Sequence, residues 1–229
     1  MVTYKSSEGV GELLLSRPPV NALTLNDLRE LIRILNDAEG EEDLLVLKIR
    51  AEGQGFSAGL DQKEMQRAAA HEQFLEYGLV TRRFLKALTD FPLPVVSVVR
   101  GFCMGLGTAI VAASDLVVAS TDATFGLPEE AWSVAYLARI VPPAKLREMT
   151  MLGNPITAAQ LHSYGSLARL VPDRDCDDAT DALIATLSRK SARSLRAGKR
   201  KLQLVGNIDH DRAFWLEQGV MWSDESWRE

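Results

Sequence analysis

Residues 94–130 read PVVSVVRGFCMGLGTAIVAASDLVVASTDATFGLPEE, and this stretch decides the fold. The β-branched run at 95–99 predicts a buried strand. Small apolar residues at 108–114 predict a short helix that packs closely against its neighbours, and residues 116–119 predict the next strand. A buried strand therefore leads into a helix, and a second strand leads the chain toward Glu129.

Glycines flank the start of this predicted helix, at positions 105 and 107. N–H groups in the first turn of a helix have no partner within the helix, and the helix dipole adds partial positive charge there. Because these glycines let a ligand approach the backbone of Leu106, the stretch favours a site that stabilises an oxyanion. A G-x-G pattern is also typical of a turn that only permits tight packing, and both interpretations stay open here.

The composition indicates one domain with appended helices or, alternatively, two small domains. The chain has 229 residues, with 26 basic and 31 acidic side chains and a net charge of −5. This acidic balance argues against a general nucleic-acid-binding protein. Two cysteines, Cys103 and Cys176, are too few for a disulfide framework or a tetrahedral cysteine–zinc cluster, and we expect no bound metal.

The hydropathy pattern predicts neither a membrane span nor a signal peptide. The longest uncharged part of the central stretch, 101–114, is too short to cross a bilayer. The N-terminus is polar and lacks the apolar core of a signal peptide. We therefore expect a protein of the reducing cytoplasm, without a membrane partner.

A second glycine-rich loop follows another strong strand. Residues 44–50 predict that strand, and residues 53–61 then read GQGFSAGLD, with three glycines. Both glycine loops follow a strand and open a helix, so together they could direct the N–H groups of Leu60 and Leu106 toward one point. Such an oxyanion hole, combined with the carboxylate of Glu129, suits reactions through an enolate, in which a base removes a proton next to a carbonyl.

The rest of the chain predicts further strands and helices. We expect strands at 11–16 and 167–171, and helices at 25–38, 71–90, 143–152, 177–190, 192–205 and 209–222, with a short helix opening at 157. Thr24 or Asn26 is expected to cap the first helix, and Asp61 to cap a helix that begins near Gln62. The run at 199–201, Lys-Arg-Lys, is typical of a solvated helix face.

Several motifs, in the same order along the chain, resemble those of the crotonase, or enoyl-CoA hydratase/isomerase, superfamily. Residues 56–65, FSAGLDQKEM, resemble the pattern F-x-A-G-x-D-x-K-E-M, and residues 125–129, FGLPE, match F-G-x-P-E. Residues 17–23 match R-P-x-x-N-A-L, and residues 101–115 resemble the G-x-x-x-G-x-G helix opening of the family. The chain is identified on these motifs as a member of that superfamily.

The resemblance implies an α/β fold, in which β-β-α turns form a spiral followed by C-terminal helices. The spiral core, with the acyl-CoA site, would occupy 1–172, and the helices at 173–229 would support a homotrimer or a dimer of trimers. The substrate would be an acyl-CoA thioester that brings its own coenzyme A, with no separate cofactor. The thioester oxygen would accept hydrogen bonds from the backbone N–H groups of Leu60 and Leu106.

The resemblance also suggests which residues contact the substrate. The residues expected to line the coenzyme A site are Ala22, Ser57, Ala58, Asp61 and Gly105. Trp132 and Tyr136 are candidates for shaping the acyl pocket, although packing in the core would explain them equally well. Cys103 lies beside a glycine loop, but no histidine is placed to activate it, so we expect no nucleophilic role.

One departure from the family pattern bears on the reaction. Hydratases of the family carry two glutamates; the second matches Glu129, and the first, twenty residues earlier, falls on Ala109. Because alanine cannot ionise, the site resembles that of enoyl-CoA isomerases in fatty acid metabolism, where one glutamate moves a proton along the acyl chain. Two alternatives remain. One is other enolate chemistry, namely hydration, hydrolysis, decarboxylation or C–C bond formation. The other is a catalytically silent acyl-CoA-binding protein.

Overall fold

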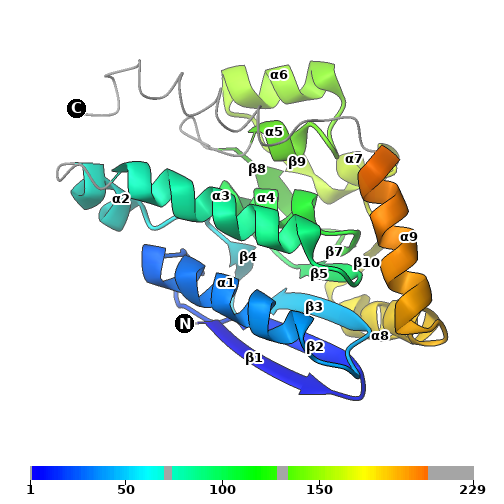
Figure 1. Ribbon diagram of the computed structural model, residues 1–229. Coiled ribbons are helices and arrows are strands. Elements are labelled where there is room, and N and C mark those ends of the chain that lie inside the picture. The colour runs from blue at the N-terminus through cyan, green and yellow to red at the C-terminus, as the bar shows by residue number, and fades with distance from the viewer. Residues whose placement is uncertain (1, 70–73, 128–133, 206–229) are drawn as a thin grey trace.

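Two β-sheets form the centre of the structure, which is a computed structural model that describes residues 2–69, 74–127 and 134–205 (Figure 1). The six-stranded sheet has the order β1 (Val2–Ser7), β2 (Val10–Leu15), β3 (Val46–Ala51), β5 (Val95–Val99), β7 (Leu116–Ser120) and β10 (Arg169–Val171). The four-stranded sheet has the order β4 (Gly55–Ser57), β6 (Phe102–Met104), β8 (Thr124–Gly126) and β9 (Ile156–Thr157). Neighbouring strands are parallel except for the pairs β1–β2 and β8–β9.

The chain moves back and forth between the two sheets, which produces a spiral. Each of β3, β5 and β7 in the larger sheet is followed by a short strand in the smaller one, and then by helix. The helices that follow these strand pairs are α2 (Gln62–Ala69) and α3 (Phe74–Asp90), α4 (Leu106–Ala113), and α5 (Val134–Leu137) and α6 (Pro143–Leu152). The structure therefore confirms the predicted α/β spiral of β-β-α turns.

The remaining helices lie before and after this spiral. They are α1 (Leu25–Glu39), α7 (Ala158–Ser163), the short 3₁₀ helix Asp173–Asp175, α8 (Cys176–Ser188) and α9 (Ala192–Val205). Thr24 caps α1 in a capping box with Asp27, so of the two predicted caps Thr24 is the one used. In the described ranges, none of the helices is long and apolar enough to cross a bilayer.

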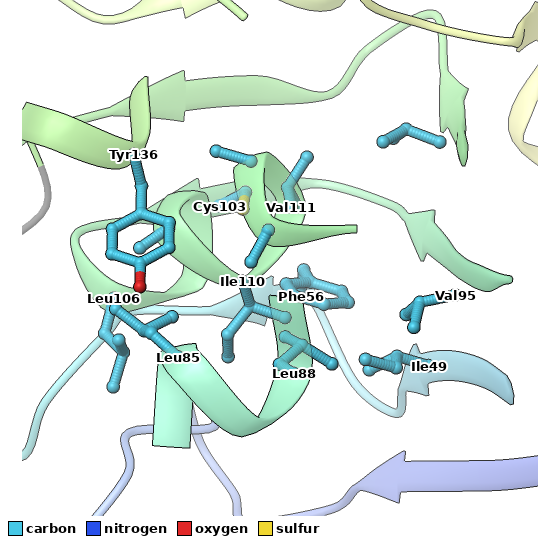
Figure 2. Close-up of a cluster of buried hydrophobic side chains, with 14 of the residues drawn as sticks. Ile49, Phe56, Leu85, Leu88, Val95, Cys103, Leu106, Ile110, Val111 and Tyr136 are labelled. Carbon is cyan, nitrogen blue, oxygen red and sulfur yellow. The ribbon is translucent and has the colours of Figure 1, made fainter. Parts of the chain in front are cut away.

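Helix α4 lies inside the core, because every one of its eight residues is buried. Figure 2 shows Leu106, Ile110 and Val111 of α4 among side chains contributed by α3, α5 and β4. The helix ends with two alanines and has Gly107 in its first turn. A Cβ added to Gly107 would lie 2.8 Å from the Ser57 carbonyl oxygen. The predicted close packing of this segment is confirmed, and the first turn of α4 contacts the end of β4.

Several short or polar strands escaped prediction. β1 is an edge strand with mostly polar residues, and β4, β6 and β8 have three residues each, too few to show a period-2 pattern. The predicted helix at 71–90 is confirmed from Phe74 onward. Its first residues and the predicted helix at 209–222 lie outside the described residues.

Lys199 corrects the prediction that 199–201 forms a solvated helix face. Arg200 and Lys201 are exposed, but the Lys199 side chain is buried, with its Nζ 2.7 Å from the Asp115 carboxylate and 3.0 Å from the Leu93 carbonyl oxygen. Burial lowers the pKa of Lys199, and the negative charge of Asp115 opposes that change. The partner lies 84 positions away in the sequence, so a local pattern gives no sign of this contact.

We expect the Lys199→Ala variant to unfold more easily than wild type. Removing the ammonium group leaves the Leu93 carbonyl oxygen without its donor, while the Asp115 carboxylate, 26% exposed, keeps its hydrogen bond from the Val95 N–H. We therefore expect a loss of about 1 to 2 kcal/mol of unfolding free energy. Urea denaturation measures this loss, and Lys201→Ala is the matched control, with an expected change within about 0.5 kcal/mol. Equal losses in the two variants would contradict a structural role for the Lys199 contact.

Candidate active site

The backbone on either side of Leu60 is held by Leu23, which forms a parallel bridge with Leu60. The Leu23 N–H donates to the Gly59 carbonyl oxygen at 2.8 Å, and the Asp61 N–H donates to the Leu23 carbonyl oxygen at 2.9 Å. In a parallel bridge of this kind, the N–H of the central residue points away from the partner strand. Within the described part of the chain, the Leu60 N–H donates to no backbone carbonyl.

Leu106 offers a second N–H, because it is the first residue of α4 and Gly105 is its N-cap. Gly105 has φ 54° and ψ −120°, a conformation that glycine adopts readily, and its own N–H donates to the Gly126 carbonyl oxygen at 2.9 Å. Among the residues that the structure describes, no side chain caps this end of α4. The predicted turn conformation at Gly105 is thus observed; its predicted contact with coenzyme A stays a prediction.

The two glycine loops meet. Gly59 has φ +93°, and a Cβ placed on it would lie 3.0 Å from the Leu106 nitrogen and 3.0 Å from the Met104 carbonyl oxygen. The residue before the first predicted donor therefore contacts the nitrogen of the second. The structure brings the loops that carry Leu60 and Leu106 together at Gly59, where a side chain would be tight. The joint action of Leu60 and Leu106 as hydrogen-bond donors stays a prediction.

Parallel pairing explains why these loops meet. β4, β6 and β8 are neighbours in the smaller sheet and run in the same direction. The segments that follow the three strands therefore leave the sheet at one edge, which is where ligands bind in open α/β sheets. The first carries Leu60, the second carries Leu106, and the third continues toward Glu129.

Glu129 and Trp132 lie outside the described residues, and the described chain before them ends at Leu127. The end of β8 is nevertheless fixed against α4. The Thr108 hydroxyl lies 3.0 Å from the Gly126 carbonyl oxygen and 2.8 Å from that of Cys103. The strand that leads to Glu129 is thus joined to the first turn of the helix that carries Leu106.

Three of the residues predicted to line the coenzyme A site lie in adjoining loops and are partly exposed, namely Ala22, Ala58 and Asp61. The Asp61 carboxylate accepts the Glu64 N–H at 3.0 Å, which confirms its predicted role as the cap of α2. Arg17 joins the loops, with its guanidinium 3.5 Å from Asp61 and 3.3 Å from the Ala22 carbonyl oxygen. Binding of coenzyme A by these residues stays a prediction.

Ser57 differs from this group, because it has no exposed surface. Its hydroxyl donates to the Asn21 carbonyl oxygen at 2.7 Å and accepts the Gly59 N–H at 3.0 Å. The sequence placed Ser57 at the coenzyme A site, whereas both of its hydrogen bonds stay within the protein.

Asn21 is a site residue to which the sequence assigned no role. It is buried with φ 52°, and its amide donates to the carbonyl oxygens of Glu52 and Gly55 at 2.7 and 3.0 Å. Its own Oδ1 accepts the Arg17 N–H at 2.7 Å. An asparagine after two prolines signals a residue suited to positive φ, but only the fold shows which backbone groups it joins.

The side chains near the loops supply little chemistry of their own. Ala109 is fully buried in the apolar core, at the position where the family pattern has its first glutamate. Cys103 is also fully buried, and burial raises the pKa of its thiol, which disfavours the nucleophilic thiolate. The described residues include no group of three or more histidine, cysteine, aspartate or glutamate side chains that could hold a metal ion.

Comparison with known proteins agrees with this architecture. Residues 5–221 match the family model described as enoyl-CoA hydratase/isomerase. The chain is 34% identical over 216 residues to (7aS)-7a-methyl-1,5-dioxo-2,3,5,6,7,7a-hexahydro-1H-indene-carboxyl-CoA hydrolase of Rhodococcus jostii strain RHA1, covering 93% of this chain and 84% of the relative. It is 33% identical over 222 residues to the human mitochondrial enoyl-CoA hydratase domain-containing protein 3, covering 93% and 73%.

The solved structures give the same result for the fold. The crystal structure of human enoyl-CoA hydratase domain-containing protein 3 superposes with a TM-score of 0.85 at 26% identity, and the match covers 97% of this chain and 90% of that one. An enoyl-CoA hydratase from Mycobacterium avium subsp. paratuberculosis K-10 gives a TM-score of 0.85 at 25% identity, covering 97% and 94%. With these matches and the two converging loops, the chain belongs to the enoyl-CoA hydratase/isomerase family, which acts on acyl-CoA thioesters.

Proposed function

We propose that this protein stabilises the enolate of an acyl-CoA thioester, and that Glu129 moves the proton without a second carboxylate. The observation that carries the proposal is the contact between the two glycine loops, together with the Leu60 and Leu106 N–H groups, which donate to no backbone carbonyl within the described residues. Two such donors stabilise the negative charge that develops on a thioester oxygen. Coenzyme A enters as part of the substrate, and the proposed reaction needs no other cofactor.

The proposed reaction is isomerase-like because of Ala109. Its methyl group is buried among apolar side chains and can neither orient a water nor deliver a proton. One carboxylate suffices to remove a proton next to the thioester and to return it two carbons away while the hole holds the dienolate. Concerted addition of water needs a second polar group, because one group must orient the water while a proton is delivered to carbon.

Hydrolysis is the second candidate, and the 34% identity to a CoA-ester hydrolase favours it. An enolate-stabilising hole serves that reaction too, because both reactions place negative charge on the same oxygen. A relative at 27% identity is a trans-2-decenoyl-[acyl-carrier-protein] isomerase, which supports the first candidate. The third candidate, binding of acyl-CoA without turnover, requires the loops but not Glu129.

A substrate panel separates these candidates. The protein is incubated with 2-enoyl-CoA and 3-enoyl-CoA series and with a fused bicyclic dioxo carboxyl-CoA, and products are followed by mass spectrometry and NMR. Interconversion of 2-enoyl and 3-enoyl esters supports the isomerase. A CoA ester that becomes heavier by one water supports addition of water, and release of free coenzyme A with a carboxylic acid supports hydrolysis of the thioester. Binding without any product supports an acyl-CoA-binding protein without catalytic activity.

The Glu129→Gln variant should lose solvent deuterium exchange at the α or γ carbon of a bound acyl-CoA. Glutamine cannot accept the proton, and general acid–base catalysis is worth about 100- to 10,000-fold in rate. Affinity for the CoA ester should stay near that of wild type, because the N–H donors are untouched. Exchange at the same rate in both proteins would contradict the single-base mechanism and favour the silent protein.

The Leu106→Pro variant tests the hole through its backbone. Proline removes the N–H donor and is well tolerated at the first position of a helix, so the fold should persist. We expect the exchange rate to fall by about 100- to 1000-fold, as for loss of one oxyanion-hole donor. Leu106→Ala is the control that shortens the side chain and keeps the N–H. An unchanged rate in folded Leu106→Pro protein would exclude Leu106 as a donor.

Oligomeric state follows only from the family resemblance, and we propose a homotrimer or a dimer of trimers. Sedimentation equilibrium at micromolar concentration should give a mass three or six times that of one chain. A stable monomer would contradict the proposal. The cytoplasmic location, the role in fatty acid metabolism and the division of the chain at residue 172 stay predictions of the sequence.

A further inference from the structure

Ser57 contacts a neighbour in sequence of each of the two predicted oxyanion donors. On one side, its hydroxyl accepts the N–H of Gly59, the residue before Leu60, at 3.0 Å. On the other side, its backbone packs against Gly107, the residue after Leu106, where an added Cβ would lie 2.8 Å from the Ser57 carbonyl oxygen. Ser57 is at the end of β4 and has no exposed surface, so no part of this arrangement depends on solvent.

The hydroxyl is fixed by a rigid partner. It donates to the Asn21 carbonyl oxygen at 2.7 Å, and Asn21 is itself held by hydrogen bonds to Glu52, Gly55 and Arg17. A serine hydroxyl has one hydrogen to donate, and here it also accepts one bond, so its orientation is set by both neighbours. The Gly59 N–H is therefore held against a fixed oxygen rather than against water.

The hydrogen bond between the Gly59 N–H and the Ser57 hydroxyl restrains a glycine, the residue with the greatest backbone freedom. Gly59 has φ +93°, and a glycine in this region has several accessible conformations. The bridge to Leu23 fixes the Gly59 carbonyl and the Asp61 N–H, while the Ser57 hydroxyl fixes the Gly59 N–H. The Gly59 carbonyl shares a peptide plane with the Leu60 N–H, and the Gly59 N–H belongs to the preceding peptide. Both peptides that flank the Gly59 Cα are thus held, which restricts rotation at Gly59 and, with it, the direction of the Leu60 N–H.

We propose that Ser57 is a positioning residue for the oxyanion hole, whose hydroxyl aligns the Leu60 N–H with the thioester oxygen. This inference rests on the proposed function, because it assumes that Leu60 and Leu106 bind that oxygen. It differs from the expectation that Ser57 contacts coenzyme A. A positioning role predicts weaker polarisation of the thioester carbonyl in a Ser57 variant, with little change in affinity for coenzyme A esters.

The test uses butyryl-CoA labelled with ¹³C at the thioester carbon, bound to wild type, Ser57→Ala and Ser97→Ala protein. Ser97 is the matched control, since it is equally buried and its hydroxyl bonds Ser114 at 2.7 Å, away from both loops. Hydrogen bonds to the carbonyl oxygen move the ¹³C resonance downfield. We expect Ser57→Ala to lose part of this shift and Ser97→Ala to keep it, with dissociation constants within about 3-fold of wild type, a difference of under 1 kcal/mol.

The rate readout should agree with the spectrum. Deuterium exchange at the α carbon should fall about 10-fold in Ser57→Ala, a fraction of the effect of removing a whole donor, and should be unchanged in Ser97→Ala. Ser57→Cys keeps a similar side-chain volume with a weaker hydrogen bond, and we expect an intermediate shift and rate. If Ser57→Ala does not fold, Ser57→Cys provides the test. A wild-type ¹³C shift in Ser57→Cys would overturn the inference.

The remaining outcomes separate the two proposals. A wild-type shift and rate in Ser57→Ala would overturn the positioning role and leave the oxyanion hole intact. A loss of affinity of 10-fold or more, confined to the Ser57 variants, would make Ser57 a coenzyme A ligand instead. A wild-type complex without any downfield shift would overturn the hole itself, and with it both the proposed function and this inference.

Discussion

The close approach of Gly59 to the start of α4 is the constraint on which the site depends. A Cβ at Gly59 would lie 3.0 Å from the Leu106 nitrogen, so the two loops meet without an intervening side chain. The approach follows from parallel pairing of β4 with β6, which makes both loops leave one edge of the smaller sheet. The burial of α4 fixes the second loop, and the bridge between Leu23 and Leu60 fixes the first. The meeting of the two loops, on which the proposed hole depends, is thus a product of the fold.

In the proposed site, backbone N–H groups stabilise the negative charge on the thioester oxygen, and other groups determine which reaction follows. Proteins in this family share the fold, yet the relatives at 34% and 27% identity are named a hydrolase and an isomerase. The N–H groups of Leu60 and Leu106 can serve either reaction, because neither depends on side-chain chemistry. In this chain, the position that matches the first glutamate of the family pattern holds the buried methyl group of Ala109. Under the proposed function, the number of carboxylates, rather than the hole, decides the proton transfers.

The sequence predicts the helices and long strands well, because their apolar spacing is local. Residues 95–99 and 143–152 match β5 and α6 closely. Strands of three residues, such as β4 and β6, are too short to show an alternating apolar pattern, although they set the geometry of the proposed hole. The prediction of a solvated Lys199 was wrong because its partner, Asp115, lies 84 positions away. The hydrogen bond from Ser57 to Asn21, 36 positions away, was not predicted for the same reason. Glycine motifs located the site, and long-range hydrogen bonds explain how it is held.

A crystal structure with a bound, unreactive acyl-CoA tests the central claim most directly. The claim is that two peptide N–H groups, from Leu60 and Leu106, bind one thioester oxygen. The account predicts that this oxygen lies about 2.7 to 3.2 Å from both nitrogens, within the range of N–H···O hydrogen bonds. A thioester oxygen bound elsewhere, or within reach of only one of the two nitrogens, would contradict it.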